Sequence, residues 1–156
     1  MPNRTRFFCI KVKKETPKTA KSLSALLKLV IHYEHCNKKG STLYGFDANL
    51  SKDYISEMNS TPNKKVLFFI SKNEGSQNCS GFVFVGTLID IIDKEKAERK
   101  VIPDWFINNN HRNYLLIENL KWINNEKNYN TAIFKSQNGI KIENIKGGFS
   151  LVEKQN

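Results

Sequence analysis

Residues 65–92 read KVLFFISKNEGSQNCSGFVFVGTLIDII and contain two apolar runs of strand length. The first run, at 65–71, is almost continuously apolar, which is typical of a buried strand. The second run, at 81–92, has the same character and contains Gly86, a residue at which a β-bulge can form. The polar, glycine-containing segment 72–80 joins the two runs. This stretch therefore predicts two buried strands with a hairpin-like connection, and hence a β-sheet.

Two helices are expected before this pair of strands. Apolar residues between 18 and 35 recur at helical spacing, and Thr16 and Pro17 suit the N-cap and the first helical position. Gly40 lies beyond the expected end of this helix. A second, shorter helix is predicted over 50–58. We expect the apolar stripe of the first helix to cover the sheet, because a domain of this size needs helices to enclose its core.

Further strands are expected on both sides of these elements. Asn138 and Gly139 form a strong two-residue turn sequence, which predicts a hairpin there. Segment 102–113 is rich in Pro and Asn and is expected to be a loop. Because short turns join most of the strands, the sequence predicts an α+β fold with a curled mixed β-sheet or barrel and helices packed outside it. We expect residues 1–156 to form a single domain. The additional strands are predicted at 6–12, 114–118, 131–135, 140–145 and 149–152.

Positive charge is concentrated in the N-terminal third of the chain. The formal net charge is +10, and residues 1–40 have ten Lys or Arg residues against two acidic ones. A local basic surface attracts phosphate groups through electrostatic steering and counterion release. We therefore expect a polyanionic partner. The predicted phosphate-binding residues are Lys11, Lys13, Lys14, Lys38 and Lys39.

Few features of the sequence favour an enzyme or a metal site. The three cysteines are far apart and have neither metal-ligand spacing nor a disulfide pattern. His32 and His35 lie three residues apart on the expected first helix, but no second group of ligands follows. No nucleophile motif, glycine-rich phosphate loop or carboxylate pair is present. We expect no enzyme activity, cofactor or metal, and a hydrolase that uses His35 or His111 is the weakest alternative.

The sequence has no signal peptide and no long apolar segment. We therefore expect an intracellular protein of the cytoplasm or nucleus that does not associate with membranes. The composition predicts neither a repeat nor a linker, and we expect a monomer.

Three aromatic residues, Tyr44, Phe46 and Trp105, lie in segments that are expected to be loops. An aromatic side chain in a loop either packs against the domain or binds a ligand. Stacking on a nucleobase contributes about 1–3 kcal/mol, and aromatic walls also enclose N-methyl groups. These residues are therefore candidates for holding a base, whereas the alternative for Trp105 is that it covers the end of a barrel.

The order of the motifs resembles the YTH domain. The matching segments are RFFCIKV at 6–12, KVLFFIS at 65–71, SGFVFVG at 80–86, NYLLIENL at 113–120 and FKSQNGIKIENIKGGFSLV at 134–152. Each motif is weak alone, but their order extends over nearly the whole chain. The resemblance implies a PUA-like fold that recognises N6-methyladenosine in single-stranded RNA through an aromatic cage. The helix at 18–35 is then an insertion relative to the family.

The resemblance also implies roles for individual residues. Tyr44 or Phe46 falls at the position of the first cage residue, and Trp105 falls at the position of a cage wall. Contacts with the base edge or the RNA are implied for Gly45, Ser71, Asn73 and Asn138.

Two other hypotheses remain open. The related EVE and ASCH domains share the PUA-like architecture, and a divergent member would bind RNA or modified DNA without selectivity for N6-methyladenine. Alternatively, the helix at 18–35 docks a protein partner through apolar residues that its own sheet leaves uncovered.

Overall fold

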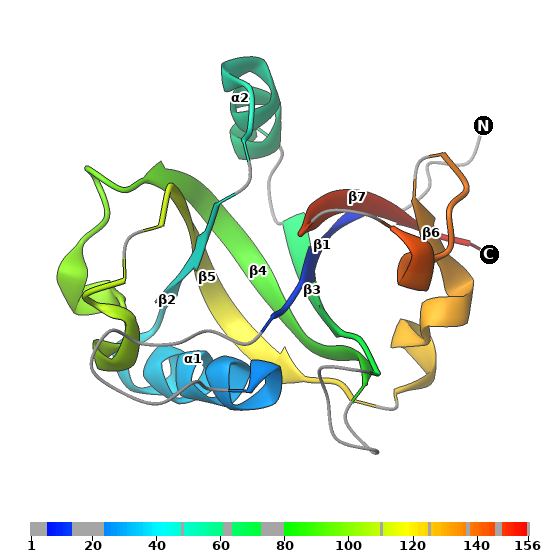
Figure 1. The fold of residues 1–156 in the computed structure, drawn as a ribbon, viewed down its shortest axis with the longest axis horizontal. Coiled ribbons are helices and arrows are strands. Elements are labelled where there is room, and N and C mark those ends of the chain that lie inside the picture. Colours follow the sequence, from blue (N-terminus) through cyan, green and yellow to red (C-terminus); the bar gives the residue numbers. More distant parts are fainter. Residues whose placement is uncertain are drawn as a thin grey trace.

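A single mixed sheet runs through the protein in the computed structural model (Figure 1). The structure describes residues 6–13, 24–47, 49–60, 64–72, 80–109, 111–124, 126–136, 138–145 and 148–155. Within these ranges the sheet has seven strands in the order β2-β5-β4-β3-β1-β7-β6. The strands are β1 (Arg6–Lys11), β2 (Thr42–Phe46), β3 (Lys64–Ile70), β4 (Gly81–Asp93), β5 (Asn113–Trp122), β6 (Phe134–Ser136) and β7 (Phe149–Lys154). The α-helices are α1 (Ala25–Lys39) and α2 (Lys52–Ser60), and short 3-10 helices lie at Arg99–Val101, Asp104–Phe106, Lys127–Tyr129, Thr131–Ile133 and Ile142–Asn144.

The two apolar runs that dominate the sequence form β3 and β4, which pair antiparallel at the centre of the sheet as predicted. The ladder between β4 and β5 has a register shift opposite Gly86, between Val85 and Thr87. The extra residue of this irregularity belongs to β5, where Asn119 has a φ of 52°. The bulge is therefore present, but Gly86 faces it instead of forming it.

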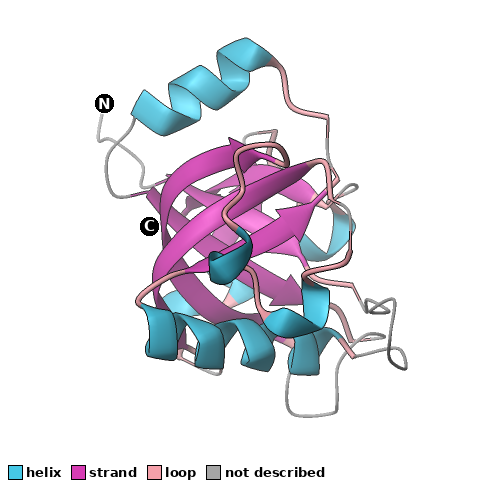
Figure 2. Cartoon of the chain, turned by 90° about the vertical axis from the view of Figure 1, so that its left-hand side faces the viewer, coloured by secondary structure: helices cyan, strands magenta, loops and turns pink. Residues whose placement is uncertain are grey.

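The sheet is curled and does not close into a barrel (Figure 2). Its end strands, β2 and β6, are not paired with each other among the described residues. Strands β1 and β3 are parallel, and the other named strand pairs are antiparallel. Helix α1 packs against β5 and β2 on one side of the sheet (Figure 1). The α+β class and the curled mixed sheet are thus confirmed.

Helix α1 is held at both ends by caps. The Ser24 side chain accepts a hydrogen bond from the backbone N–H of Leu27 at the start, and Gly40 adopts a left-handed conformation directly after the end. This helix corresponds to the one predicted over 18–35, but it continues to Lys39, where Gly40 ends it. The predicted cap at Thr16 and Pro17, with residues 18–23, lies outside the described residues. Helix α2 begins and ends two residues later than predicted.

Two predictions of local structure are wrong. Tyr44 and Phe46 lie in β2 and not in a loop, because their segment pairs with β5 and its side chains enter the core. The predicted hairpin of 131–135 with 140–145 is reduced to one bridge, and the short strand β6 pairs with β7 instead. A 3-10 turn at Ile142–Asn144 instead buries Ile142 and Ile145 together in a core cluster that includes Phe134. In an extended strand these two side chains would point to opposite faces, so both could not enter the same core.

The close approach of β5 to Gly86 yields a prediction about stability. A Cβ atom at Gly86 would lie 2.5 Å from Cγ2 of Ile117. Gly86→Ala should therefore destabilise the fold by about 1–3 kcal/mol through overpacking, measured by urea denaturation. Gly148→Ala is the matched control, because a Cβ atom there meets no atom of the other described residues within 4 Å. Equal unfolding midpoints for the two variants would contradict this account of the bulge.

Candidate nucleic-acid interface

A pocket lies at the seam where β2 approaches β1 and β7 without pairing with them. Its volume is about 440 Å³, which is within the usual range for sites that bind small ligands. We call it the seam pocket. Its lining residues are Ile10, Lys11, Lys13, Lys28, Tyr44, Gly45, Phe46, Asp47, His111 and Gly148.

Three lysines border the seam pocket, namely Lys28 of α1, Lys11 at the end of β1 and Lys13 beyond it. Lys28 projects from the buried face of α1 and is only 7% exposed. Its Nζ lies 4.6 Å from the centroid of the Tyr44 ring, where the quadrupole of the ring stabilises the ammonium group. Lys11 ends β1 and donates a hydrogen bond to the carbonyl oxygen of Ile145. Lys13 follows two residues later and is exposed.

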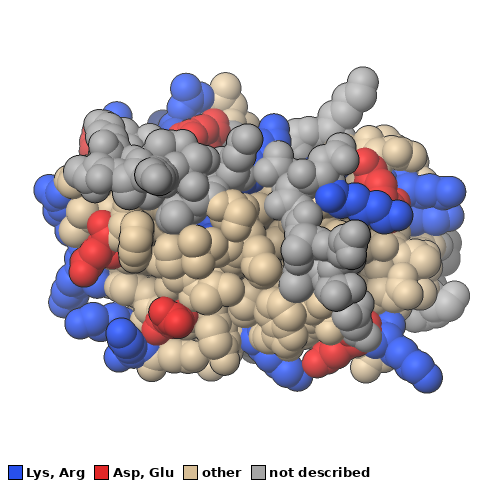
Figure 3. Space-filling model, turned by 60° about the horizontal axis from the view of Figure 1, so that its bottom comes forward, with Lys and Arg blue, Asp and Glu red and all other residues tan. Residues whose placement is uncertain are grey.

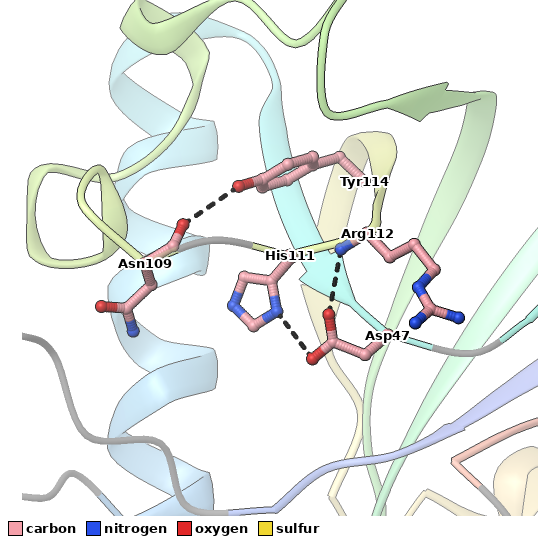
Figure 4. A network of polar contacts seen from close by, with 5 residues as sticks. All are labelled: Asp47, Asn109, His111, Arg112 and Tyr114. Carbon is pink, nitrogen blue, oxygen red and sulfur yellow. Dashed lines mark hydrogen bonds and ion pairs between the residues drawn. The ribbon is translucent and has the colours of Figure 1, made fainter.

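A polar network closes one side of the seam pocket (Figure 4). Nδ1 of His111 lies 3.2 Å from Oδ2 of Asp47, and the backbone N–H of Arg112 donates to Oδ1 of the same carboxylate at 2.9 Å. The His111 ring lies directly over Gly45, where any Cβ atom would overlap it. The glycine in β2 therefore allows the segment before β5 to rest on the edge of the sheet.

His111 also borders a second and larger pocket. This loop pocket has a volume of about 800 Å³ and lies beside the segment between β4 and β5. The Tyr114 hydroxyl donates to the carbonyl oxygen of Asn109 at 3.3 Å and holds the end of that segment (Figure 4). The other lining residues are Lys94, Glu95, Ala97, Arg99, Ile102, Ile107 and Asn108.

The three predicted cage residues do not lie together. Tyr44 and Phe46 are 3% and 9% exposed, and both border the seam pocket. Trp105 is 51% exposed and borders a different hollow. The aromatic neighbours of Tyr44 and Phe46 belong to the core: the Tyr44 ring contacts Phe68, and the Phe46 ring stacks on Phe149. Their rings are thus largely committed to packing.

The other predicted contact residues divide between separate parts of the surface. Gly45 borders the seam pocket. Ser71 directly follows β3, whereas Asn138 is exposed in the turn after β6, at the opposite end of the strand order from β2. Asn73 lies outside the described residues. The predicted phosphate-binding residues also separate. Lys11 and Lys13 border the seam pocket, whereas Lys38 and Lys39 border the hollow with Trp105. Lys14 lies outside the described residues.

Two groups that shape the seam pocket were not predicted. One is Lys28, which in the sequence is only one of several basic residues in the N-terminal third. Its spacing from Ala25, Leu29 and His32 places it on the buried face of α1, and this spacing could have identified it. The other is the pair of Asp47 and His111, which are far apart in the sequence and have no recognisable motif.

The described part of the chain has no group of three or more His, Cys, Asp or Glu side chains that could hold a metal ion. None of the helices in the described residues is both long and apolar enough to cross a membrane. Comparisons with protein-family models, with curated proteins and with solved structures gave no match to this chain.

Cys9 is a buried thiol in β1, and its environment bears on nucleophilic chemistry. Burial raises the pKa of the Cys9 thiol to about 12, and the positive charge of Lys11 opposes this effect. A thiol with this pKa is protonated at neutral pH, so Cys9 lacks the thiolate that nucleophilic catalysis needs.

The raised pKa of Cys9 predicts a loss of stability at alkaline pH. Above pH 9 the thiol ionises in the unfolded chain but stays protonated in the folded one, so folding becomes less favourable as the pH rises from 9.0 towards about 12. Between about pH 8 and about pH 10, the wild-type protein should lose about 1 kcal/mol more stability than Cys9→Ala. Urea denaturation at both pH values measures this difference, and parallel pH dependences of the two proteins would contradict it.

Proposed function

We propose that this protein binds single-stranded RNA and holds a backbone phosphate in the seam pocket among Lys11, Lys13 and Lys28. The observation that carries this proposal is that three lysines border one concave site, where Lys13 is exposed and Lys28 is buried. The ammonium group of Lys11 already donates to the carbonyl oxygen of Ile145. Among the described residues that line the pocket, Asp47 is the only acidic one, and its carboxylate is already paired with His111. The pocket therefore has an excess of positive charge for an anionic ligand.

The surroundings of Lys28 strengthen its attraction for a phosphate. The lysine lies among aromatic and aliphatic side chains, which keep water away from the ammonium group. Charges interact more strongly where water is excluded, and hydrogen bonds between ammonium and phosphate groups are roughly twice as strong as neutral ones. The exposed Lys13 at the rim then provides electrostatic attraction from a distance.

The shape of the site favours a single strand over a duplex. A pocket between β1 and β2 admits one nucleotide that has left its stack, and proteins recognise unstacked nucleotides mostly in single-stranded RNA. On the face that includes α1, Lys and Arg side chains gather at both ends, with some acidic residues among them (Figure 3).

The PUA-like type of fold is part of this proposal, and the curled mixed sheet with α1 across it supports that assignment. Selectivity for N6-methyladenosine would require aromatic walls with free faces. Tyr44 has Lys28 over its ring, and Phe46 stacks on Phe149. We therefore favour the alternative in which a PUA-like module binds RNA without selecting the methylated base.

Docking of a protein partner through α1 has less support. The buried residues of this helix, which include Ala25, Leu29 and Cys36, pack into the core of its own domain. Leu27 is its one large apolar side chain that is substantially exposed, so the described part of α1 offers a partner little apolar surface.

The proposal predicts a salt-dependent contact through Lys13. Lys13→Gln should weaken binding of a fluorescently labelled RNA of about 8 nucleotides and reduce the slope of log K against log[salt] by about 0.7. Fluorescence anisotropy over a range of salt concentrations measures both quantities. Lys121→Gln is the matched control, because Lys121 is exposed near the end of β5 and does not border the seam pocket. If both variants weaken binding equally, net charge is responsible and the seam pocket is not the site.

The packing of Tyr44 and Phe46 predicts that a methyl group on adenine has little effect. Two RNAs of about 8 nucleotides, identical except for one N6-methyladenosine, should bind with affinities that agree within about twofold, or less than about 0.5 kcal/mol. Anisotropy titrations of the wild-type protein provide the test. A preference of about tenfold or more for the methylated RNA would show that an aromatic cage does form.

A further inference from the structure

Trp105 lies in a separate hollow that the proposed phosphate site does not include. This hollow has a volume of about 420 Å³ and is formed by the second half of α1 and the segment that contains two 3-10 helices. We propose that it is a second nucleotide subsite, in which a base of the same RNA strand stacks on Trp105 and nearby lysines bind its phosphate. This inference rests on the proposed RNA binding. The lining residues are Ile31, Glu34, His35, Lys38, Lys39, Lys100, Pro103, Asp104 and Trp105.

The neighbouring residue holds Trp105 in an outward position. Phe106 is 3% exposed, and its ring stacks on His32 of α1 with centroids 5.1 Å apart and an interplanar angle of 14°. Trp105 lies in the same 3-10 turn, and half of its surface stays accessible. A ring presented by an anchored turn loses little conformational entropy when a base stacks on it. Such stacking is tolerant of base identity, because every base has a π-face.

Three lysines line the same hollow as Trp105. Lys38 and Lys39 lie in the last turn of α1, and Lys100 lies in the 3-10 helix that precedes Trp105. Nζ of Lys100 is 3.5 Å from a carboxylate oxygen of Glu98, but both side chains are largely exposed. An exposed ion pair contributes little to stability, so Lys100 can exchange this partner for a phosphate.

The hollow also contains a polar atom that needs a partner. Nδ1 of His35 is buried and has no hydrogen-bond partner within the part of the chain that the structure describes. Buried polar atoms without partners are uncommon. His35 lines the hollow between Ile31 and the terminal lysines of α1, so a nucleotide that enters there brings hydrogen-bonding groups close to an imidazole that lacks them.

Helix α1 connects the two subsites along one face. Lys28, Ile31, His35 and Lys38 follow each other at intervals of three or four residues and therefore form one stripe. Lys28 borders the seam pocket, and the other three residues border the hollow with Trp105. The ten helical steps from Lys28 to Lys38 span about 15 Å. One short strand can therefore reach both subsites.

The two tryptophans of the chain allow a direct test. In Trp122→Phe the only remaining tryptophan is Trp105, and a base that stacks on it should quench its fluorescence as RNA of about 8 nucleotides is added. Trp105→Phe leaves Trp122 as the reporter. Trp122 lies at the end of β5. The start of this strand, Asn113, closely follows His111 of the seam pocket and lies up to about 30 Å from Trp122. The fluorescence of Trp122 should change little.

Affinity measurements separate stacking from a structural role. Trp105→Ala should weaken RNA binding by about fivefold or more, whereas Trp105→Phe retains an aromatic face and should lose less. Urea denaturation of both variants shows whether they remain folded, which the exposure of Trp105 predicts.

The possible outcomes distinguish this inference from the proposed function. RNA binding that depends on Lys13 but neither quenches Trp105 nor weakens in Trp105→Ala would overturn the second subsite and leave the seam pocket as the site. Binding that needs Trp105 but not Lys13 would support the hollow and remove the phosphate site in the seam pocket. If the wild-type protein binds no RNA at any salt concentration, both proposals are wrong.

Discussion

The stacking of aromatic rings across the seam of the sheet is the interaction on which the rest of this structure depends. Phe149 of β7 stacks on Phe8 of β1 and on Phe46 of β2, with centroids 5.5 and 5.4 Å apart. Strands β2 and β7 are separated by four other strands in the sheet, so this contact exists only because the sheet curls back on itself. Side-chain packing thus holds the curl where backbone hydrogen bonds do not.

This mode of closure explains why a pocket lies at the same place. Strand β2 cannot pair with β1 or β7, because both edges of each of these strands already have hydrogen-bonded partners in the sheet. Ring packing keeps the strands further apart, and beyond the rings the seam opens among Lys11, Lys13 and Lys28. The buried Lys28 fits this environment because its ammonium group lies over the Tyr44 ring, and the exposed Lys13 lies beyond the end of β1. The position of these charges beside one another therefore follows from the curl of the sheet.

The sequence predicted the features of this fold that depend on neighbouring residues. The paired strands β3 and β4 and the presence of α1 follow from local hydrophobic patterns, although α1 ends four residues later than predicted. The features it missed depend on distant residues. Segment 42–46, TLYGF, is short and contains a glycine, and it becomes a buried strand only through pairing with β5 about 70 residues later. The same limit applies to the site, because Lys28 and His111 come together only through the fold.

The different surroundings of the aromatic residues indicate which of them can exchange partners for a base. The cation–π contact of Lys28 with Tyr44 contributes on the order of 0.5–2 kcal/mol, which is comparable to the roughly 1–3 kcal/mol of a base stacked on an aromatic ring. A base that replaced Lys28 over Tyr44 would gain little and would also displace a buried charge. Trp105 carries no such cost, because water covers the exposed half of its surface. In the proposed RNA complex, the buried rings would therefore shape the phosphate site and the exposed indole would hold the base.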